Sequence, residues 1–307
     1  MRDNITQLLS EIQTGGYNAL ARTITMVENE LPGYEQLLLS LQNTHSAKVL
    51  GITGPPGAGK STLVNALLHY WITQGKRIAV IAVDPSSPFN YGALLGDRIR
   101  MSEFYTHPNV FIRSLASRGA LGGLHPKIIE ITDVVKHAPF DLVLVETVGV
   151  GQSEVEVAGL ADCTVVALVP EAGDEVQTLK AGIMEIADIF VVNKADRDAA
   201  ETLYRNLKIM VHEKAHDGNE IPVIKTIATD KKGVEELADA VEQFLREHNS
   251  DTEKRLHLLT EKSWQLIQAR RMKDISKSGL RSALSESLKQ PGFNIYAFTK
   301  SFTGEAQ

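Results

Sequence analysis

The chain has 307 residues, of which 43% are hydrophobic and 23% are charged, a composition typical of a folded protein with a substantial core. Its formal net charge of −6 argues against a protein that binds nucleic acid through the phosphate backbone. The single cysteine, Cys163, excludes an intramolecular disulfide, and we expect it to be a small buried hydrophobic residue. No apolar run is long enough to cross a membrane and no secretory signal begins the chain, so we expect a cytoplasmic protein without membrane association.

Residues 1–46 are predicted to form a helical extension. Apolar residues recur at helical spacing in successive stretches, and the first of these faces contains Ile5, Leu8, Leu9 and Ile12. Glycine and proline at residues 15–16 and 31–33 separate the stretches.

Between residues 47 and 248, short apolar runs alternate with helical stretches. Near-continuous apolar strands separated by helices are typical of a parallel sheet that is covered on both faces. We therefore predict an α/β domain with a mostly parallel sheet of about seven strands. The predicted strands are residues 49–52, 78–83, 110–112, 142–145, 163–169, 189–192 and 223–226.

A phosphate-binding loop follows the first predicted strand. The segment satisfies the pattern G-x-x-x-x-G-K-[ST], and a predicted helix from Lys60 to about Gln74 comes next. Glycines let successive backbone N–H groups face the phosphates, and the helix N-terminus adds a favourable dipole. Thr62 stands where a dinucleotide-binding loop needs its last glycine, which excludes that alternative. The predicted nucleotide-binding residues are Gly54, Pro55, Pro56, Gly57, Ala58, Gly59, Lys60, Ser61 and Thr62.

Carboxylates at strand ends indicate a magnesium site beside this loop. Asp84 ends the second predicted strand and Glu146 the fourth, while Asp97 lies in a loop between strands. Ligands of open α/β sheets bind at the carboxyl ends of the strands, and magnesium prefers oxygen ligands. We expect these carboxylates to bind Mg²⁺ together with Ser61. Gly149 is expected to present its N–H to the γ-phosphate.

The same elements supply the candidate catalytic residues. Lys60 is expected to contact the β- and γ-phosphates, and Asp97 and Glu146 to act beside it. The sequence shows no convincing general base of its own. We therefore expect catalysis by positioning and electrostatic stabilisation while water attacks in line.

The predicted strand 189–192 is followed by an N-K-x-D sequence, in which Asn193, Lys194 and Asp196 are the defined positions. Guanine presents its N1–H and its exocyclic amine to one carboxylate, here Asp196, whereas adenine would leave that carboxylate unpaired at a cost of about 1–3 kcal/mol. The stem of Lys194 is expected to lie over the purine, and the backbone N–H of Ala228 to contact the base oxygen. The sequence therefore predicts GTP or GDP as ligand.

Residues 212–216 match the zinc-protease pattern H-E-x-x-H, with Glu235 or Glu236 as a conceivable third ligand to His212 and His216. The segment lies inside the nucleotide-binding pattern, and Lys214 indicates a solvent-facing helix end. We expect no zinc here.

Residues 249–307 are predicted to be a helical arm. Leu256, Leu259, Ser263 and Ile267 follow helical spacing, but the segment is too short to build a core of its own. We therefore expect it to pack on a second subunit and the protein to be a homodimer.

Several of these segments together resemble the MeaB/ArgK/MMAA family, and the similarity runs from about residue 19 to residue 298. The segments that carry it are residues 54–62, 83–88, 96–101, 113–116, 146–154, 173–177 and 193–196. The resemblance implies a P-loop GTPase that is a chaperone of an adenosylcobalamin-dependent acyl-CoA mutase, chiefly methylmalonyl-CoA mutase. By hydrolysing GTP it would control the loading and protection of the cofactor, which belongs to the partner.

The resemblance also implies roles for individual residues. Asp84, Asp97 and Glu146 match the magnesium and switch carboxylates of the family. The C-terminal helices match its dimerisation arm. Residues 171–180 match a switch that communicates with the mutase, and Lys180 matches a lysine tied to activated hydrolysis. The implied switch residues are Asp174, Glu175, Gln177 and Lys180.

Two alternatives remain open at this point. The first is a P-loop kinase of the ArgK type, against which the guanine motif and Glu146 argue. The second is a related metallochaperone GTPase for nickel enzymes, which would be expected to carry a histidine-rich or cysteine-containing tract; the sequence shows neither.

Overall fold

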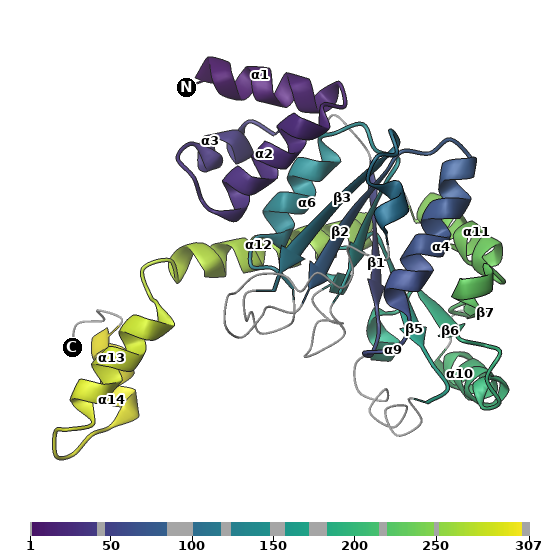
Figure 1. Cartoon of the computed structure of the whole chain (residues 1–307). Helices are drawn as coiled ribbons and strands as arrows, with labels where there is room; N and C mark the ends of the chain where they lie inside the picture. The colour runs from purple at the N-terminus through teal and green to yellow at the C-terminus, as the bar shows by residue number, and fades with distance from the viewer. Residues whose placement is uncertain are drawn as a thin grey trace. The chain divides into compact units, whose positions relative to one another are not determined.

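The computed structural model describes residues 2–41, 47–84, 101–117, 124–147, 157–171, 183–214, 220–248 and 252–302. The chain divides into two compact units, residues 1–252 and residues 253–307 (Figure 1). The nucleotide-binding motifs and the sheet belong to the first unit, and most of the predicted arm belongs to the second.

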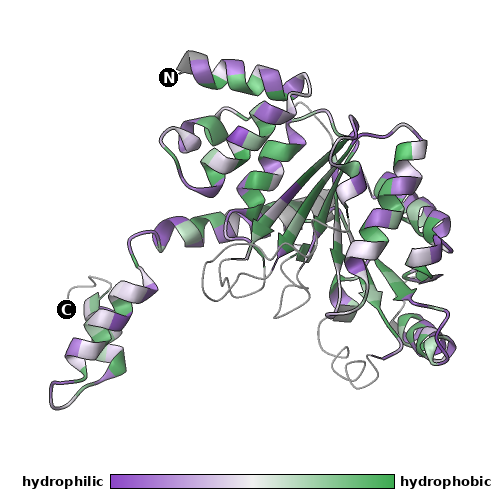
Figure 2. Ribbon diagram, viewed as in Figure 1, coloured by the Kyte–Doolittle hydropathy of each residue, from purple (hydrophilic) through white to green (hydrophobic). Residues whose placement is uncertain are grey.

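Within the described residues, seven strands form one sheet in the order β3-β2-β4-β1-β5-β6-β7, and every neighbouring pair is parallel. Figure 2 shows these strands as almost wholly hydrophobic, and most of their residues are buried. The predicted parallel α/β fold is therefore confirmed. The strands are β1 (Lys48–Thr53), β2 (Ile78–Asp84), β3 (Val110–Ala116), β4 (Leu142–Glu146), β5 (Cys163–Leu168), β6 (Ile189–Asn193) and β7 (Val223–Thr226).

Helices cover both faces of the sheet because alternate strand residues point to opposite sides. Leu50 and Ile52 of β1 share a core with α4 and α11, whereas Val49 shares a core with α6 on the other face. Val192 of β6 packs with α10. The helices of this region are α4 (Lys60–Thr73), η1 (Ser102–Phe104), α6 (Ile128–Lys136), α9 (Ile183–Ile186), α10 (Ala200–Lys214), η3 (Ala228–Asp230) and α11 (Val234–Glu247).

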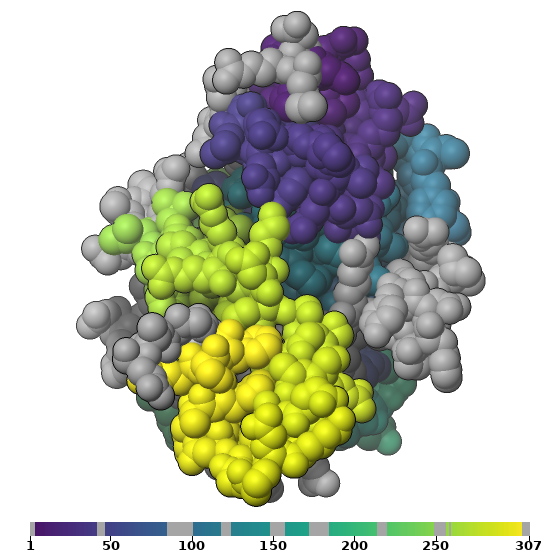
Figure 3. All heavy atoms as spheres, turned by 90° about the vertical axis from the view of Figure 1, so that its left-hand side faces the viewer, coloured from purple at the N-terminus to yellow at the C-terminus, as the bar shows by residue number. Residues whose placement is uncertain are grey.

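The N-terminal extension is helical as predicted, with α1 (Arg2–Gln13), α2 (Tyr17–Glu28) and α3 (Tyr34–Leu39). Figure 3 shows these helices in purple, packed against one another at the top of that view. Ile12, Leu20 and Ile24 are fully buried in the core that these helices share with α6 and the sheet. A polar contact adds to this packing, because Arg113 of β3 donates to Glu28 of α2 at 2.7 Å. The extension is thus part of the first compact unit.

The C-terminal segment is also helical, with α12 (Thr252–Arg271), α13 (Lys277–Ser287) and α14 (Ile295–Phe302). Helices α13 and α14 contain no buried residue. Large apolar side chains of α12 are exposed, among them Leu259 at 51% and Trp264 at 58%. No helix among the described residues combines the length and the apolarity that a membrane span requires.

Candidate nucleotide-binding site

The phosphate-binding loop connects β1 to α4 and depends on glycine at its bends. Gly54, Gly57 and Gly59 adopt φ values of +139°, +76° and +80°, where side chains other than hydrogen are strained. Space is also limited, because a Cβ on Gly54 would lie 2.0 Å from the carbonyl oxygen of Ala167 in β5. A Cβ on Gly59 would lie 2.5 Å from Nδ2 of Asn193. The predicted helix after the loop is confirmed as α4.

Lys60 begins α4 and turns its ammonium back over the loop. Its Nζ donates to the carbonyl oxygens of Gly54 at 2.8 Å and of Pro55 at 3.1 Å, and only 6% of the residue is exposed. The positive charge therefore lies at the start of the phosphate-binding loop, at the N-terminus of a 14-residue helix. Both features favour an anion at this place.

Ser61 and Glu146 meet beside the loop. The Ser61 hydroxyl in the first turn of α4 donates to Oε1 of Glu146 at 2.6 Å, and both residues are buried. Glu146 is the last residue of β4, which lies between β1 and β2 in the sheet. Two motifs 85 residues apart in the sequence are thus in direct contact.

Asp84 is a second carboxylate at the carboxyl ends of these strands. It is the last residue of β2, is 1% exposed, and lies on the strand next to Glu146, with Ala82 opposite Glu146 in the register. Its backbone oxygen accepts a hydrogen bond from the N–H of Ser117 after β3.

Magnesium fits this set of side chains. Ser61, Glu146 and Asp84 offer oxygen ligands, which Mg²⁺ prefers, and a nucleotide-bound ion needs only one or two of them besides phosphate and water. Adjacent ligands of an octahedral ion at about 2.1 Å lie about 3 Å apart. The 2.6 Å between the Ser61 and Glu146 oxygens is close to that spacing. In the described part of the chain, no group of three or more histidine, cysteine or acidic side chains is arranged to hold a metal ion by itself.

Asn193 connects the phosphate-binding loop to the predicted base-binding segments. Its Nδ2 donates to the carbonyl oxygen of Ala58 at 2.9 Å. Its Oδ1 accepts from the Thr226 hydroxyl at 3.0 Å and from the backbone N–H of Ala228 at 3.3 Å. Asn193 was predicted to bind the nucleotide, and in the structure it links β6, the phosphate-binding loop and the segment after β7. In this structure the N–H of Ala228 is directed to Asn193, and its contact with a base stays a prediction.

The other residues of the N-K-x-D motif lie at the surface of the same region. Lys194 adopts a positive φ of 55°, and its Cε would be 4.0 Å from a Cβ built on Gly59. The lysine stem therefore runs alongside the phosphate-binding loop. Asp196 is exposed two residues further on. Its position agrees with a carboxylate that receives a ligand from solvent.

A hollow of about 270 Å³ borders this region between α4 and η3. Ala228, which lies next to the Asn193 link, forms one of its walls. The lining residues are Thr62, Asn65, Ala66, Ala228, Thr229 and Lys231.

Several predicted site residues lie outside the described residues. They are Asp97, Gly149, Asp174, Glu175, Gln177 and Lys180. Their assignment to magnesium, phosphate and partner switching stays a prediction. Conversely, no role was predicted for Thr226 beyond the end of a predicted strand, although its hydroxyl donates to Oδ1 of Asn193. The only available signal was its place at the end of a strand.

The H-E-x-x-H segment does not assemble a zinc site from its described members. His212 is exposed on α10 and pairs with Glu220 at 2.5 Å. Glu235 and Glu236 are on α11, which packs against the opposite face of the sheet from α10. His216 lies outside the described residues. Neither glutamate is therefore near enough to serve as a ligand with His212.

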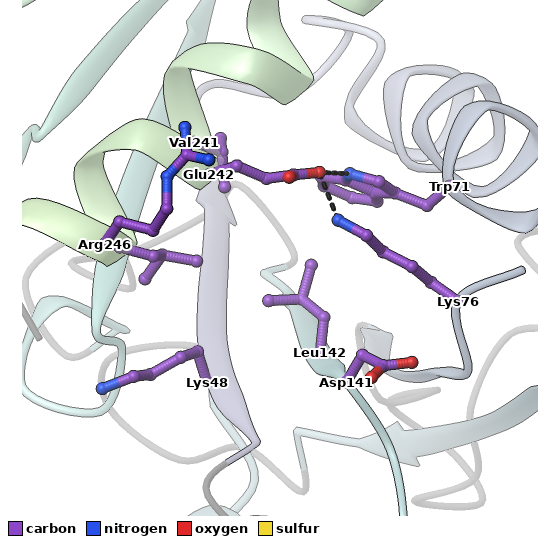
Figure 4. Close-up of a pocket in the computed structure, with 9 residues that line it drawn as sticks. Lys48, Trp71, Lys76, Asp141, Leu142, Val241, Glu242 and Arg246 are labelled. Carbon is purple, nitrogen blue, oxygen red and sulfur yellow. Dashed lines mark hydrogen bonds and ion pairs between the residues drawn. The ribbon is translucent and has the colours of Figure 1, made fainter. Parts of the chain in front are cut away.

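A second cavity, of about 150 Å³, lies at the amino ends of the strands, opposite the nucleotide-binding end (Figure 4). Lys48 and Leu142, which begin β1 and β4, form part of its wall. Inside it, Oε1 of Glu242 accepts a hydrogen bond from Nε1 of Trp71 at 2.9 Å and forms an ion pair with Lys76. This cluster joins the end of α4 to α11 and is separate from the nucleotide-binding end.

Comparison with known proteins agrees with the geometry. The family model described as methylmalonyl-CoA mutase-associated GTPase MeaB matches residues 20–279. A putative GTPase of Pyrococcus abyssi is 45% identical over 259 residues, which cover 82% of this chain and 80% of that protein. The GTPase ArgK of Escherichia coli is 36% identical over 251 residues, which cover 78% and 76%.

A mouse protein named methylmalonic aciduria type A homolog, mitochondrial, is 38% identical over 209 residues, 63% of this chain and 50% of the mouse protein. Among solved structures, an LAO/AO transport system kinase is similar with a TM-score of 0.71 and 24% identity, covering 99% of this chain and 97% of that chain. That structure supports the fold alone. The family match and the relatives confirm the resemblance inferred from the sequence motifs, and the chain belongs to the MeaB family of methylmalonyl-CoA mutase-associated GTPases.

Proposed function

We propose that this protein is a magnesium-dependent GTPase that acts as a chaperone of an adenosylcobalamin-dependent acyl-CoA mutase of the methylmalonyl-CoA mutase type. Nucleotide binding is supported above all by the hydrogen bonds of Asn193. This one side chain joins the phosphate-binding loop at Ala58 to the segment predicted to contact the base. This link would hold the predicted phosphate-binding and base-binding segments in a fixed relation to each other. Membership of the MeaB family supports the chaperone part.

The phosphate end of the site stabilises negative charge. Lys60 and the N-terminus of α4 provide positive charge at the loop, and the loop amides are expected to donate to phosphate oxygens. Ser61, Asp84, Glu146 and Asp97 are the proposed ligands of magnesium, and the ion when bound neutralises charge on the β- and γ-phosphates. Gly149 is the proposed donor to the γ-phosphate.

Without an internal general base, this arrangement is expected to hydrolyse GTP slowly, at roughly 10⁻⁴ to 10⁻² s⁻¹ by analogy with small GTPases. We propose that the mutase completes the site. The proposed contacts are the switch residues Asp174, Glu175, Gln177 and Lys180, with Lys180 and Asp97 contributing to activated hydrolysis. GTP hydrolysis would then control when adenosylcobalamin is loaded into the mutase and when the bound cofactor is protected.

Two experiments test the two parts. Calorimetry with Mg²⁺ should show binding of GTP and GDP and much weaker binding of ATP; equal or tighter ATP binding would contradict the guanine assignment. Single-turnover hydrolysis should accelerate when a cognate methylmalonyl-CoA mutase is added at saturation. An unchanged rate with a mutase that binds the protein would contradict partner activation.

The kinase alternative makes a different prediction. A P-loop kinase of the ArgK type would transfer the γ-phosphoryl to an acceptor, whereas a GTPase releases it to water. Quantitative release of inorganic phosphate from GTP, with no labelled acceptor when γ-labelled GTP is incubated with the protein and mutase, would support the GTPase.

A further inference from the structure

Two buried threonines face each other at the carboxyl ends of β1 and β4, where the phosphate-binding loop begins. Thr53 is the last residue of β1, and Thr147 directly follows the last residue of β4. Their hydroxyl oxygens are 2.9 Å apart, and the residues are 0% and 1% exposed. The pair lies 94 residues apart in the sequence.

The pair continues the sheet by one step. Ile52 of β1 is opposite Glu146 of β4 in the register, and the N–H of Thr147 donates to the carbonyl oxygen of Ile52 at 3.1 Å. Thr53 and Thr147 are the next residues after this last pair. At this step a hydrogen bond between side chains replaces the backbone pairing of β1 with β4. The bond therefore fixes β1 and β4 to each other just beyond their last paired residues, while Thr53 stays paired with Val166 of β5.

Each threonine is covalently next to a residue of the proposed site. Thr53 precedes Gly54, the first residue of the phosphate-binding loop, whose φ of +139° and close approach to Ala167 leave it little freedom. Thr147 follows Glu146, whose carboxylate contacts Ser61 at 2.6 Å. A displacement of β4 relative to β1 at this step would move the Glu146 carboxylate away from Ser61.

We infer that Thr53 and Thr147 are positioning residues that hold Glu146 in register with the phosphate-binding loop for magnesium binding. The inference rests on the proposed Mg²⁺-GTPase function. Valine is close to threonine in size, and Thr53 lies opposite the apolar Val166 of β5, so the volume of the site does not by itself require two hydroxyls here. A buried hydroxyl left without its partner carries a desolvation penalty, which makes the pair mutually dependent.

The test is a double-mutant cycle with Thr53→Val, Thr147→Val and the double variant. Each single variant buries one hydroxyl whose partner has gone, so its unfolding temperature should fall. The double variant removes both hydroxyls and should recover most of that loss. The Mg²⁺ concentration for half-maximal GTP hydrolysis should rise about fivefold or more in all three variants, the equivalent of about 1 kcal/mol. GDP binding measured without Mg²⁺ should stay at the level of the unmodified protein.

If the pair only stabilised the fold, the double variant would regain its stability and would also regain the original Mg²⁺ concentration for half-maximal hydrolysis (the Mg²⁺ midpoint). That result would overturn the inference. Thr53→Ser and Thr147→Ser keep the hydroxyls and should keep the midpoint. The matched control is Thr132→Val, because Thr132 is equally buried but bonds within α6, away from the site. If the unmodified protein shows no Mg²⁺-dependent GTP hydrolysis, the proposed function itself fails, an outcome distinct from a normal midpoint in the double variant.

Discussion

Asp196 is the single side chain on which the proposed choice of base depends. It is exposed at the end of the N-K-x-D motif, beside the segment that Asn193 fixes. In Asp196→Asn, the amide would face the two guanine donors with one acceptor and a clashing donor. GTP affinity should therefore fall about 10- to 100-fold, in line with about 1–3 kcal/mol for an unsatisfied pair.

Calorimetry with GTP and with xanthosine triphosphate measures the effect. Xanthine carries a carbonyl where guanine carries its amine, so the variant should gain affinity for that nucleotide. Asp198→Asn is the control, because Asp198 is also exposed but lies beyond the motif. Unchanged GTP affinity in Asp196→Asn would contradict the assignment of this carboxylate to the base.

Residues of the site were predictable from sequence where a short motif fixes local geometry. The spacing of Gly54, Gly59 and Lys60 predicted the loop and helix that the structure shows. The Thr53–Thr147 bond was not predictable, because its partners are 94 residues apart and neither has a distinctive local pattern. Contacts of this kind depend on strand order, which the order of motifs along the chain does not specify.

At the scale of elements, helix α4 carries the phosphate-binding loop at one end and the Trp71 cluster at the other. Trp71 is fully buried, and its Nε1 donates to Glu242 of α11, which also pairs with Lys76. Glu242→Ala would leave the indole N–H without this acceptor. The free energy of unfolding should fall by about 1–3 kcal/mol, while GTP affinity should stay unchanged because the cluster lies at the opposite end of the strands.

Urea unfolding and GTP calorimetry on the same samples separate these effects. Glu236→Gln, an exposed glutamate on the same helix, should change neither quantity. Weaker GTP binding by folded Glu242→Ala protein would show that the two ends of α4 are coupled.

Glu103 in η1 is a second contact to α4 and introduces a pH dependence. Its Oε1 accepts hydrogen bonds from Asn65 Nδ2 and His69 Nε2, each at 3.0 Å. The Asn65 bond, followed by His69, holds the pKa of Glu103 below its ordinary value. Because the folded pKa is lower than the unfolded pKa, the stabilisation is fully present above the unfolded value of about 4.3 and is lost as pH falls through the folded pKa.

We therefore expect Glu103→Gln to be less stable than the unmodified protein at neutral pH, by a modest amount because the side chain is half exposed. The difference in unfolding free energy should shrink below about pH 4, where the carboxylate becomes protonated. Carboxyl titration by NMR provides an independent check, since Asn65→Ala should raise the pKa of Glu103. A difference that is constant from pH 7 to pH 3 would contradict this role.

Elements themselves were predicted well where hydrophobic periodicity was uninterrupted. The main error in strand length is β3, predicted as residues 110–112 but extending through Ala116. Arg113 and Ser114 interrupt the apolar run, yet Arg113 is accommodated because it donates to Thr25 and Glu28 of α2. A charged residue in a strand became acceptable only through the N-terminal helices, which local sequence could not reveal.

At the scale of the whole molecule, the second compact unit presents a large apolar surface on α12. Leu256, Leu259 and Ile267 share one helical face and are 50–57% exposed. Contiguous exposed apolar residues mark interaction sites, and a segment of 55 residues has little core of its own. We propose that this face packs against a second copy of the chain in a homodimer.

The double variant Leu259→Asp/Ile267→Asp should convert a dimer into a monomer. Two carboxylates in an apolar interface would have to be buried without partners, at a cost of several kcal/mol, which corresponds to a dissociation constant at least 100-fold higher. Light scattering coupled to size-exclusion chromatography, at micromolar concentration, measures the mass directly. Gln268→Asp adds one such carboxylate on α12 away from this face and should remain dimeric. A monomeric mass for the unmodified protein would contradict the proposed homodimer. GTP binding by the monomeric variant would show that the nucleotide site needs no second copy of the chain.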